Sequence, residues 1–214
     1  MSDLLDCTDP VTRPLAISAA ARAVSTGSLV VLPTDTLYGI GADAFNSAAV
    51  TSLLAAKGRG RDMPVPVLVG SWHTIDGLVS AVTGAARDLV EAFWPGALTL
   101  VVEHAPSLAW DLGDARGTVA LRMPLHPVAL ELLAETGPMA VSSANVTSMP
   151  PAVTAQQAYE QLGESVSVYL DGGEAPAGQP SSIVDMTGPR PVLLRAGAIS
   201  ADRLREVISD LEVR

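Results

Sequence analysis

The chain has 214 residues, 48% of them hydrophobic and 17% charged, so it can bury a sizeable core and global disorder is excluded. A net charge of −10 and an aromatic content of 4% argue against a protein that coats nucleic acid through its overall field. The one cysteine, Cys7, allows neither a disulfide framework nor a thiolate metal cluster, and a reducing cytoplasm fits it. Without a basic signal segment or a long apolar run, we expect no membrane association.

Helix and strand patterns alternate over the whole length. Hydrophobic spacing and cap residues predict helices at residues 14–27, 46–58, 72–79, 84–93, 127–137, 154–163 and 200–211. Short apolar runs predict strands at residues 28–33, 65–69, 97–103, 117–124, 138–145, 167–173, 181–186 and 191–197. The alternation predicts a single α/β domain over residues 1–214, built on a mixed sheet. The Pro- and Gly-rich segment 171–180 is interpreted as a mobile loop within it.

A cluster of cations, KGRGR, ends the second predicted helix. It contains Lys57, the one lysine of the chain, together with Arg59 and Arg61. Cations at a helix C-terminus complement the macrodipole, so a solvated cluster is one interpretation. However, the intervening glycines allow a ligand to approach the backbone, and Lys beside Arg suits phosphate oxygens. The cluster is therefore a candidate phosphate site.

A polar segment, LPTDTLYGIGADA at residues 32–44, follows the first predicted strand. A core strand does not require its Thr, Asp and Tyr side chains, so we predict a tight turn between apolar runs. GIGADA matches the glycine spacing of a dinucleotide fingerprint, but no helix is predicted to open there, and the chain has no P-loop. Any nucleotide must be held in another way.

Other polar side chains stand in or directly after apolar strands. Arg122 needs a partner or a ligand unless alternation turns it to solvent. His126 is interpreted as structural, because no second metal ligand stands at a useful spacing. The Ser and Asn side chains of residues 141–151 fit either ligand binding at a strand end or ordinary turn chemistry. No G-x-S-x-G motif and no Ser/His/Asp set is present.

Seven segments, in order, resemble the YrdC-like family of threonylcarbamoyl-adenylate synthases: PTDTLYGIGADA, KGRGRDMP, FWPGALTL, TVALRMPLHP, SSAN…PP, SSIVD and LLRAG. The resemblance covers about residues 15–208 and includes the family's K-x-R and S-x-N signature. It implies a twisted mixed sheet with flanking helices around a positively charged concave cavity. It also implies that ATP, L-threonine and bicarbonate give threonylcarbamoyl-AMP and pyrophosphate, with Mg²⁺ accompanying ATP. The product would feed threonylcarbamoyladenosine modification of tRNA through downstream transferase proteins.

The resemblance also implies roles for single residues. Nucleotide contacts are expected from Lys57, Arg59, Thr118, Asn145 and Arg195, the first two holding phosphates and acting in catalysis. Threonine contacts are expected from Thr36, Arg122, Ser143 and Ser181, with Arg122 on the carboxylate. Neighbouring candidates for the same site are Thr34, Asp35, Tyr38, Arg61, Met63 and Ser182.

Four positions depart from the family's common pattern. Met63 stands where many relatives carry asparagine, and Leu68 stands near a common histidine, so those two contacts are missing or replaced. Ser148 replaces a usual glycine and Ala196 a usual proline.

The residues agree with this chemistry, because a carbamate that attacks an α-phosphate needs no protein nucleophile. Both reactants are anions, and two unit charges at ~4 Å repel by about 4 kcal/mol at an effective dielectric near 20. Lys57, Arg59, Arg122 and Arg195 can offset that repulsion if they converge. Two alternatives stay open: an RNA-binding module that uses the same basic surface without catalysis, and a carbamoyl adenylator with another acceptor.

Overall fold

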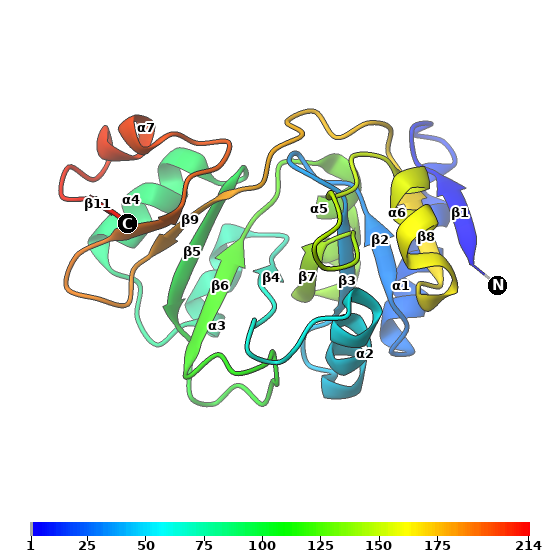
Figure 1. Cartoon of the computed structure of the whole chain (residues 1–214), viewed down its shortest axis with the longest axis horizontal. Helices are drawn as coiled ribbons and strands as arrows, with labels where there is room; N and C mark the ends of the chain where they lie inside the picture. The colour runs from blue at the N-terminus through cyan, green and yellow to red at the C-terminus, as the bar shows by residue number, and fades with distance from the viewer. Residues whose placement is uncertain (1) are drawn as a thin grey trace.

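The computed structural model describes residues 2–214, which form one mixed sheet of eleven strands in the order β1-β8-β2-β3-β7-β4-β6-β5-β9-β10-β11. The N-terminus lies at the β1 end and the C-terminus at the β11 end (Figure 1). The strands are β1 (Asp3–Asp6), β2 (Val30–Leu32), β3 (Gly39–Asp43), β4 (Val67–Leu68), β5 (Leu98–Glu103), β6 (Thr118–Arg122), β7 (Met139–Ser143), β8 (Val168–Asp171), β9 (Ser182–Asp185), β10 (Val192–Arg195) and β11 (Glu212–Val213).

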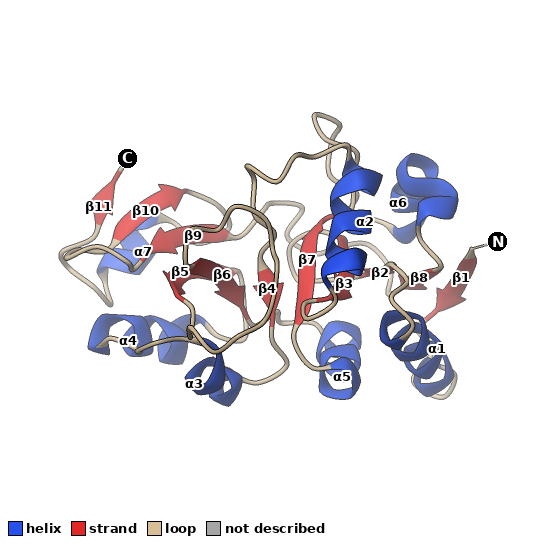
Figure 2. Ribbon diagram, turned by 90° about the horizontal axis from the view of Figure 1, so that it is seen from below, coloured by secondary structure: helices blue, strands red, loops and turns tan. Residues whose placement is uncertain are grey.

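Helices cover both faces of the sheet. They are α1 (Arg13–Ser25), α2 (Ser47–Lys57), α3 (Ile75–Leu78), α4 (Gly84–Phe93), α5 (Pro127–Thr136), α6 (Ala155–Leu162) and α7 (Ala201–Arg205), with 3₁₀ turns η1 (Trp72–Thr74) and η2 (Gly163–Ser165). Figure 2 shows α2 and α6 on one side of the sheet and α1, α3, α4 and α5 on the other. Side-chain oxygens of Asn46, Thr83, Thr154 and Ser200 cap the N-termini of α2, α4, α6 and α7.

Alternating residues of the central strands feed two apolar clusters. Leu32 of β2 and Met139 of β7 pack with α1 and α5, whereas their neighbours Val31 and Ala140 belong to the larger cluster on the other side of the strands. Successive residues of a strand point to opposite faces of the sheet, so a strand that is buried on both faces contributes apolar side chains to both clusters. The predicted α/β class with a mixed sheet and flanking helices is confirmed.

Strand β3 is a correction to the predicted turn at 32–44. Only residues 33–38 form the turn, and Gly39–Asp43 is a strand between β2 and β7. The two glycines explain why the sequence did not predict this strand, because strand interiors are usually depleted in glycine. A Cβ on Gly39 would stand 2.5 Å from a methyl of Val141, and one on Gly41 would stand 2.8 Å from the Met139 methyl. The small residues make room for β7 side chains on that face.

The sequence patterns also missed both edge strands and overextended the last helix. β1 (DLLD) is largely exposed and pairs with β8, and β11 has two residues on the outer side of β10. Neither contains an apolar run, so only pairing with a neighbour defines it. The helix predicted at 200–211 ends at Arg205. Residues 72–79 form η1 and the short helix α3 instead of one continuous helix.

We expect Gly39→Ala to lower the free energy of unfolding by about 1–3 kcal/mol, because its methyl would overlap a branched side chain in a packed layer. Gly41→Ala should cost less, since the opposing Met139 methyl ends a flexible side chain. Gly77→Ala is the control, because nothing lies within 4 Å of the added carbon. Urea denaturation measures all three, and equal values for Gly39→Ala and Gly77→Ala would contradict this account of β3.

Candidate functional site

Lys57 is a buried cation at the C-terminus of α2. The helix ends because Gly58 adopts a left-handed conformation with φ 60°. The Lys57 side chain is 2% exposed and donates to the carbonyl oxygens of Ser143 and Asn145, the latter at 2.7 Å. In return, Thr147 N donates to the Lys57 carbonyl at 2.9 Å. The lysine therefore joins α2 to the loop after β7.

Lys57 forms no ion pair with a carboxylate among residues 2–214. Burial, reinforced by the positive charge of Arg59, lowers the pKa of Lys57 to about 8. The carbonyl contacts favour the protonated form without cancelling its charge. An anion bound next to this amine would offset the free-energy cost of burying its positive charge.

Arg59 follows on the same loop with spare donor capacity. One of its terminal nitrogens donates to Ser142 Oγ at 3.2 Å. Its Nε is buried and has no hydrogen-bond partner in the described part of the chain. Buried donors without a partner are rare in folded proteins, so this group points to a missing acceptor.

Arg122 is the centre of a second cationic group, at the end of β6. It is 7% exposed, and burial lowers its pKa. Its guanidinium donates to the Gly96 carbonyl (2.9 Å), Thr36 Oγ1 (2.8 Å) and Asp35 Oδ1 (2.6 Å). Asp35 Oδ1 also accepts from Leu125 N at 2.8 Å. Because a guanidinium carries five N–H groups, these contacts leave two for a ligand.

Arg195 lies close enough to Arg122 for their charges to interact. Its Nε and a terminal nitrogen donate to the Ser181 carbonyl at 3.0 and 2.8 Å, and Ser181 Oγ lies 2.8 Å from Thr99 Oγ1. Burial lowers the pKa of Arg195, and no carboxylate pairs with it among the described residues. This group therefore combines two guanidiniums with one carboxylate.

The turn at 33–38 connects the two cationic groups. Thr36 contacts Arg122, and Thr34 Oγ1 lies 3.0 Å from Thr36 Oγ1 and holds the turn through the Leu37 carbonyl. At the other end of the turn, the Tyr38 carbonyl accepts from Ala144 N, next to the Ser143 carbonyl that Lys57 contacts. The turn thus borders Arg122 on one side and the Lys57 loop on the other.

The remaining candidates divide into two residues that are at least partly buried, Thr118 and Asn145, and two that are exposed, Arg61 and Met63. Thr118 begins β6 and donates to Ala115, and Asn145 is 7% exposed with its amide on the Val146 and Met149 carbonyls. Arg61 points outward and pairs with Asp111 (2.6 Å) and Asp114 (3.6 Å), and Met63 is exposed.

The hydroxyl of Ser182 is occupied by backbone contacts, which argues against its predicted role in the site. Its side chain has no exposed surface, and its hydroxyl contacts the Ile199 carbonyl, Ile199 N and Gly197 N. The Ser181 hydroxyl, directly before β9, instead contacts Thr99 and Arg195, so the two hydroxyls have separate partners. Sequence reasoning missed Ser142, Thr99 and the Gly96 carbonyl; of these, Thr99 gave a signal, as a lone polar residue within an apolar strand.

No three His, Cys, Asp or Glu side chains within residues 2–214 group as a metal cage. His126 precedes α5 without capping it through its side chain, and its Nδ1 is buried with no hydrogen-bond partner in the described part of the chain. Burial lowers the pKa of His126. None of the described helices is long and apolar enough to cross a membrane.

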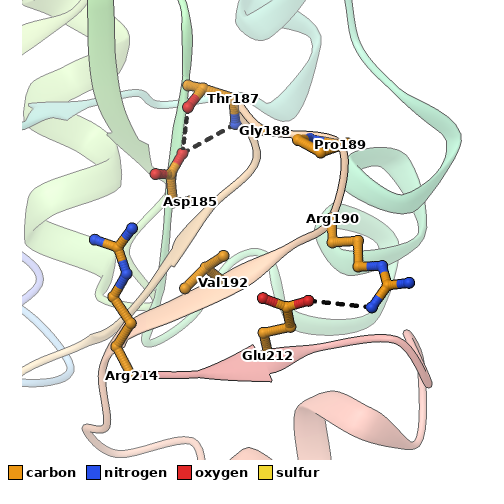
Figure 3. A pocket seen from close by; sticks show the side chains of 8 residues that line it. All are labelled: Asp185, Thr187, Gly188, Pro189, Arg190, Val192, Glu212 and Arg214. Atoms are coloured by element: carbon orange, nitrogen blue, oxygen red, sulfur yellow. Dashed lines mark hydrogen bonds and ion pairs between the residues drawn. The ribbon is translucent and has the colours of Figure 1, made fainter.

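A shallow hollow opens elsewhere, between the β9–β10 turn and β11. Figure 3 shows its charged lining residues, with Asp185 contacting Thr187 and Arg190 contacting Glu212. None of the predicted site residues lines it. The candidate site is therefore the pair of cationic groups around the 33–38 turn.

Comparison with known proteins identifies the family. The Sua5/YciO/YrdC profile, described as "Telomere recombination", matches residues 22–197, and the chain belongs to this family. The chain is 62% identical over 208 residues to the putative threonylcarbamoyl-AMP synthase of Mycobacterium tuberculosis, covering 97% of this chain and 96% of that protein. It is 35% identical over 212 residues to the threonylcarbamoyl-AMP synthase of Bacillus subtilis, covering 98% and 61%.

Two solved structures share the fold. Pyrococcus abyssi Sua5 complexed with L-threonine matches all of this chain with a TM-score of 0.95 and 32% identity, and the chain spans 63% of that protein. Escherichia coli YciO matches 95% of this chain and 100% of its own with a TM-score of 0.84 and 21% identity. The YrdC-like resemblance inferred from the motifs is confirmed.

Asp35→Asn should destabilise the fold strongly, because it leaves the buried Arg122 guanidinium without its carboxylate. We expect a loss of about 3–5 kcal/mol in the free energy of unfolding. Asp111→Asn is a matched control: it removes the carboxylate of another arginine pair at 2.6 Å, but one whose side chains are 51% and 41% exposed, against 8% and 13% for Arg122 and Asp35. That control should cost no more than about 1 kcal/mol. Similar losses in urea denaturation would contradict the structural importance of the buried pair.

Proposed function

We propose that the chain is a threonylcarbamoyl-AMP synthase that uses L-threonine, bicarbonate and ATP and releases pyrophosphate. The observation that carries the proposal is the pair of cationic groups on either side of the 33–38 turn, with the unpartnered Nε of Arg59 in one and the two spare N–H groups of Arg122 in the other. The names of the relatives and the threonine complex of Pyrococcus abyssi Sua5 support the same reaction.

Each group suits one of the two anionic reactants. Lys57 and Arg59 would bind the ATP phosphates, since neither forms an ion pair with a carboxylate among residues 2–214. Arg122 would bind the threonine carboxylate with its remaining N–H groups, beside Ser181 and Thr36. Lys57 contacts the carbonyls of Ser143 and Asn145, which would contact threonine and the nucleotide, respectively, and Thr118 and Arg195 would complete the nucleotide contacts.

The reaction then requires orientation more than a protein nucleophile. Threonine takes up the carbon of bicarbonate to form a carbamate, with loss of water. A carbamate oxygen attacks the α-phosphorus of ATP, the bond from that phosphorus to the bridging oxygen breaks, and pyrophosphate leaves with the electron pair. Fixed cations offset the repulsion between the reactants and stabilise the charge that develops on the leaving group. The enzyme is on this basis a nucleotidyltransferase.

Mg²⁺ fits as an ion that arrives with ATP. Mg²⁺ commonly keeps several waters and binds substrate phosphates with one or two carboxylates, which suits a site whose described residues offer no carboxylate cage. When bound, it would neutralise phosphate charge beside Lys57 and Arg59. We further propose that the reaction takes place in the cytoplasm and that downstream transferase proteins pass the product to tRNA.

Product analysis tests the function. Incubation with ATP, Mg²⁺, bicarbonate and each of several amino acids, followed by mass spectrometry, should give threonylcarbamoyl-AMP and pyrophosphate with threonine only. Arg59→Met should reduce product formation at least about a hundredfold, as loss of a preorganised charge contact does. Arg61→Met, which removes the outward-facing cation of the same cluster, is the control. Adenylate formation indifferent to threonine would favour another acceptor, and RNA binding without any product would favour a binding module.

The pKa of Lys57 predicts how ATP binding depends on pH. Below pH 8 the amine is protonated and the dissociation constant for Mg-ATP should be constant. Above pH 8 the free protein loses this proton, so the constant should rise by up to about tenfold per pH unit. Calorimetric titration from pH 7 to 9.5 measures it. Lys57→Met should bind Mg-ATP weakly and show no such rise, whereas Arg61→Met should show the same rise as the wild type. A constant wild-type affinity up to pH 9.5 would contradict the lowered pKa, and wild-type affinity of Lys57→Met at pH 7 would refute the role of Lys57.

A further inference from the structure

The segment between β8 and β9, residues 172–181, crosses the sheet and is here called the strap. Six strands lie between β8 and β9 in the sheet order, so seven inter-strand spacings of about 4.8 Å would separate them by roughly 34 Å in a flat sheet. A strap of ten residues can span at most about 33–36 Å. The two lengths are similar, so the strap is long enough to cross the sheet, and bends at residues 173–174, 176–177 and 179 show that it is not fully extended. Figure 1 shows it running from β8 to β9 across the edge where the 33–38 turn lies.

The strap is fixed at three places. At its start, Gly172 and Gly173 contact the Tyr38 hydroxyl. Next, Ala175 is 6% exposed and its N donates to the Val153 carbonyl at 2.8 Å. At its end, the Ser181 carbonyl accepts from Arg195 and the Pro180 carbonyl accepts from Ala198 N. Only residues 176–179 lie between the last two fixed points.

Tyr38 makes the contacts at the start of the strap with its hydroxyl alone. The hydroxyl donates to the Gly173 carbonyl at 2.5 Å and accepts from Gly172 N at 3.1 Å. The side chain has no exposed surface, and burial raises the pKa of the phenol, so it stays protonated and can donate. The Tyr38 backbone makes separate contacts, with Ala152 and with Ala144 beside the Lys57 loop.

These contacts, together with the proximity of two arginines, form a ring of neighbouring residues that includes those assigned to threonine. Along the ring, Thr36 contacts Arg122, Arg195 contacts Ser181, and the two arginines are near enough for their like charges to repel. Ser181 ends the strap, the strap begins at the Tyr38 hydroxyl, and Tyr38 belongs to the same turn as Thr36. Loss of the hydroxyl contact would weaken the start of the strap, leaving it the hydrogen bond from Gly173 N to Asp171 Oδ1 (3.0 Å), although none of the residues assigned to threonine would have been changed.

We propose that the Tyr38 hydroxyl is a positioning group for threonine: it tethers the start of the strap, whose other end is Ser181, and so helps to fix Ser181 beside Arg195. This inference rests on the proposed function. Loss of the tether should weaken threonine binding selectively, because the backbone contacts of Tyr38 toward the Lys57 loop do not involve the hydroxyl. ATP binding and the chemical step at saturating threonine should change little.

The test compares Tyr38→Phe with Tyr169→Phe. Tyr169 is also fully buried and donates its hydroxyl to a glycine carbonyl, Gly163 at 2.6 Å, at the other end of β8. Tyr38→Phe should raise KM for threonine about tenfold, as loss of one or two hydrogen bonds does, with kcat and KM for ATP within about twofold of wild type. Tyr169→Phe should leave all three within about twofold. Hydrogen exchange should show faster exchange of the Gly172 amide in Tyr38→Phe alone.

The inference is overturned if Tyr38→Phe and Tyr169→Phe have the same KM for threonine, or if Tyr38→Phe impairs ATP and threonine binding equally. A Gly-Gly insertion after Ala177 loosens the strap without touching Tyr38, and it decides the matter if Tyr38→Phe does not fold. It should reproduce the selective rise in KM for threonine; an unchanged KM overturns the inference. A wild-type protein that forms no threonine-dependent product would instead refute the proposed function, whatever the variants do.

Discussion

The buried contact between Arg122 and Asp35 is the interaction on which the arrangement of the site depends. It ties the end of β6 to the 33–38 turn, and the same guanidinium holds the Gly96 carbonyl of the segment before β5. Leaving a guanidinium this deep without a partner would be costly, so the turn and both strand ends must meet at one place. The contact also leaves N–H groups of Arg122 for a second anion. A single ion pair thus serves both the fold and the site.

The cations of the candidate site differ from those of the surface in the groups that they contact. Arg61 is matched by Asp111 and Asp114, which cancel its charge in solvent. Lys57, Arg59 and Arg195 are instead held by carbonyl and hydroxyl oxygens, which orient a cation without neutralising it. This distinction allows an acidic protein to keep a local excess of positive charge. The cost is visible at Lys57, whose pKa falls to about 8 because burial disfavours the charged amine.

Much of the fold follows from local patterns, and the exceptions have physical causes. The helices with side-chain caps, α2, α4, α6 and α7, begin where the sequence predicts them, and the strands with apolar runs lie within the predicted ranges. β3 was not predicted because its glycines, which leave room for the side chains of β7, are uncommon in strands. β1 and β11 were not predicted because only pairing with a neighbouring strand defines them. At the candidate site, the ligand contacts of Lys57, Arg59 and Arg122 stay predictions from the motifs. The sequence did not show that the Ser182 hydroxyl is occupied by Ile199 and Gly197, because those contacts form only in the folded chain.

By itself, the sequence determined the class of the fold, the family and the presence of an unusual cluster around Lys57, because caps, hydrophobic spacing and motif order are local properties of the chain. Only the tertiary structure decided which cations of that cluster turn inward, which carbonyl groups hold them, and how Tyr38 meets a strap more than 130 residues away. Those outcomes depend on strand order and on burial, and neither is encoded within any single segment.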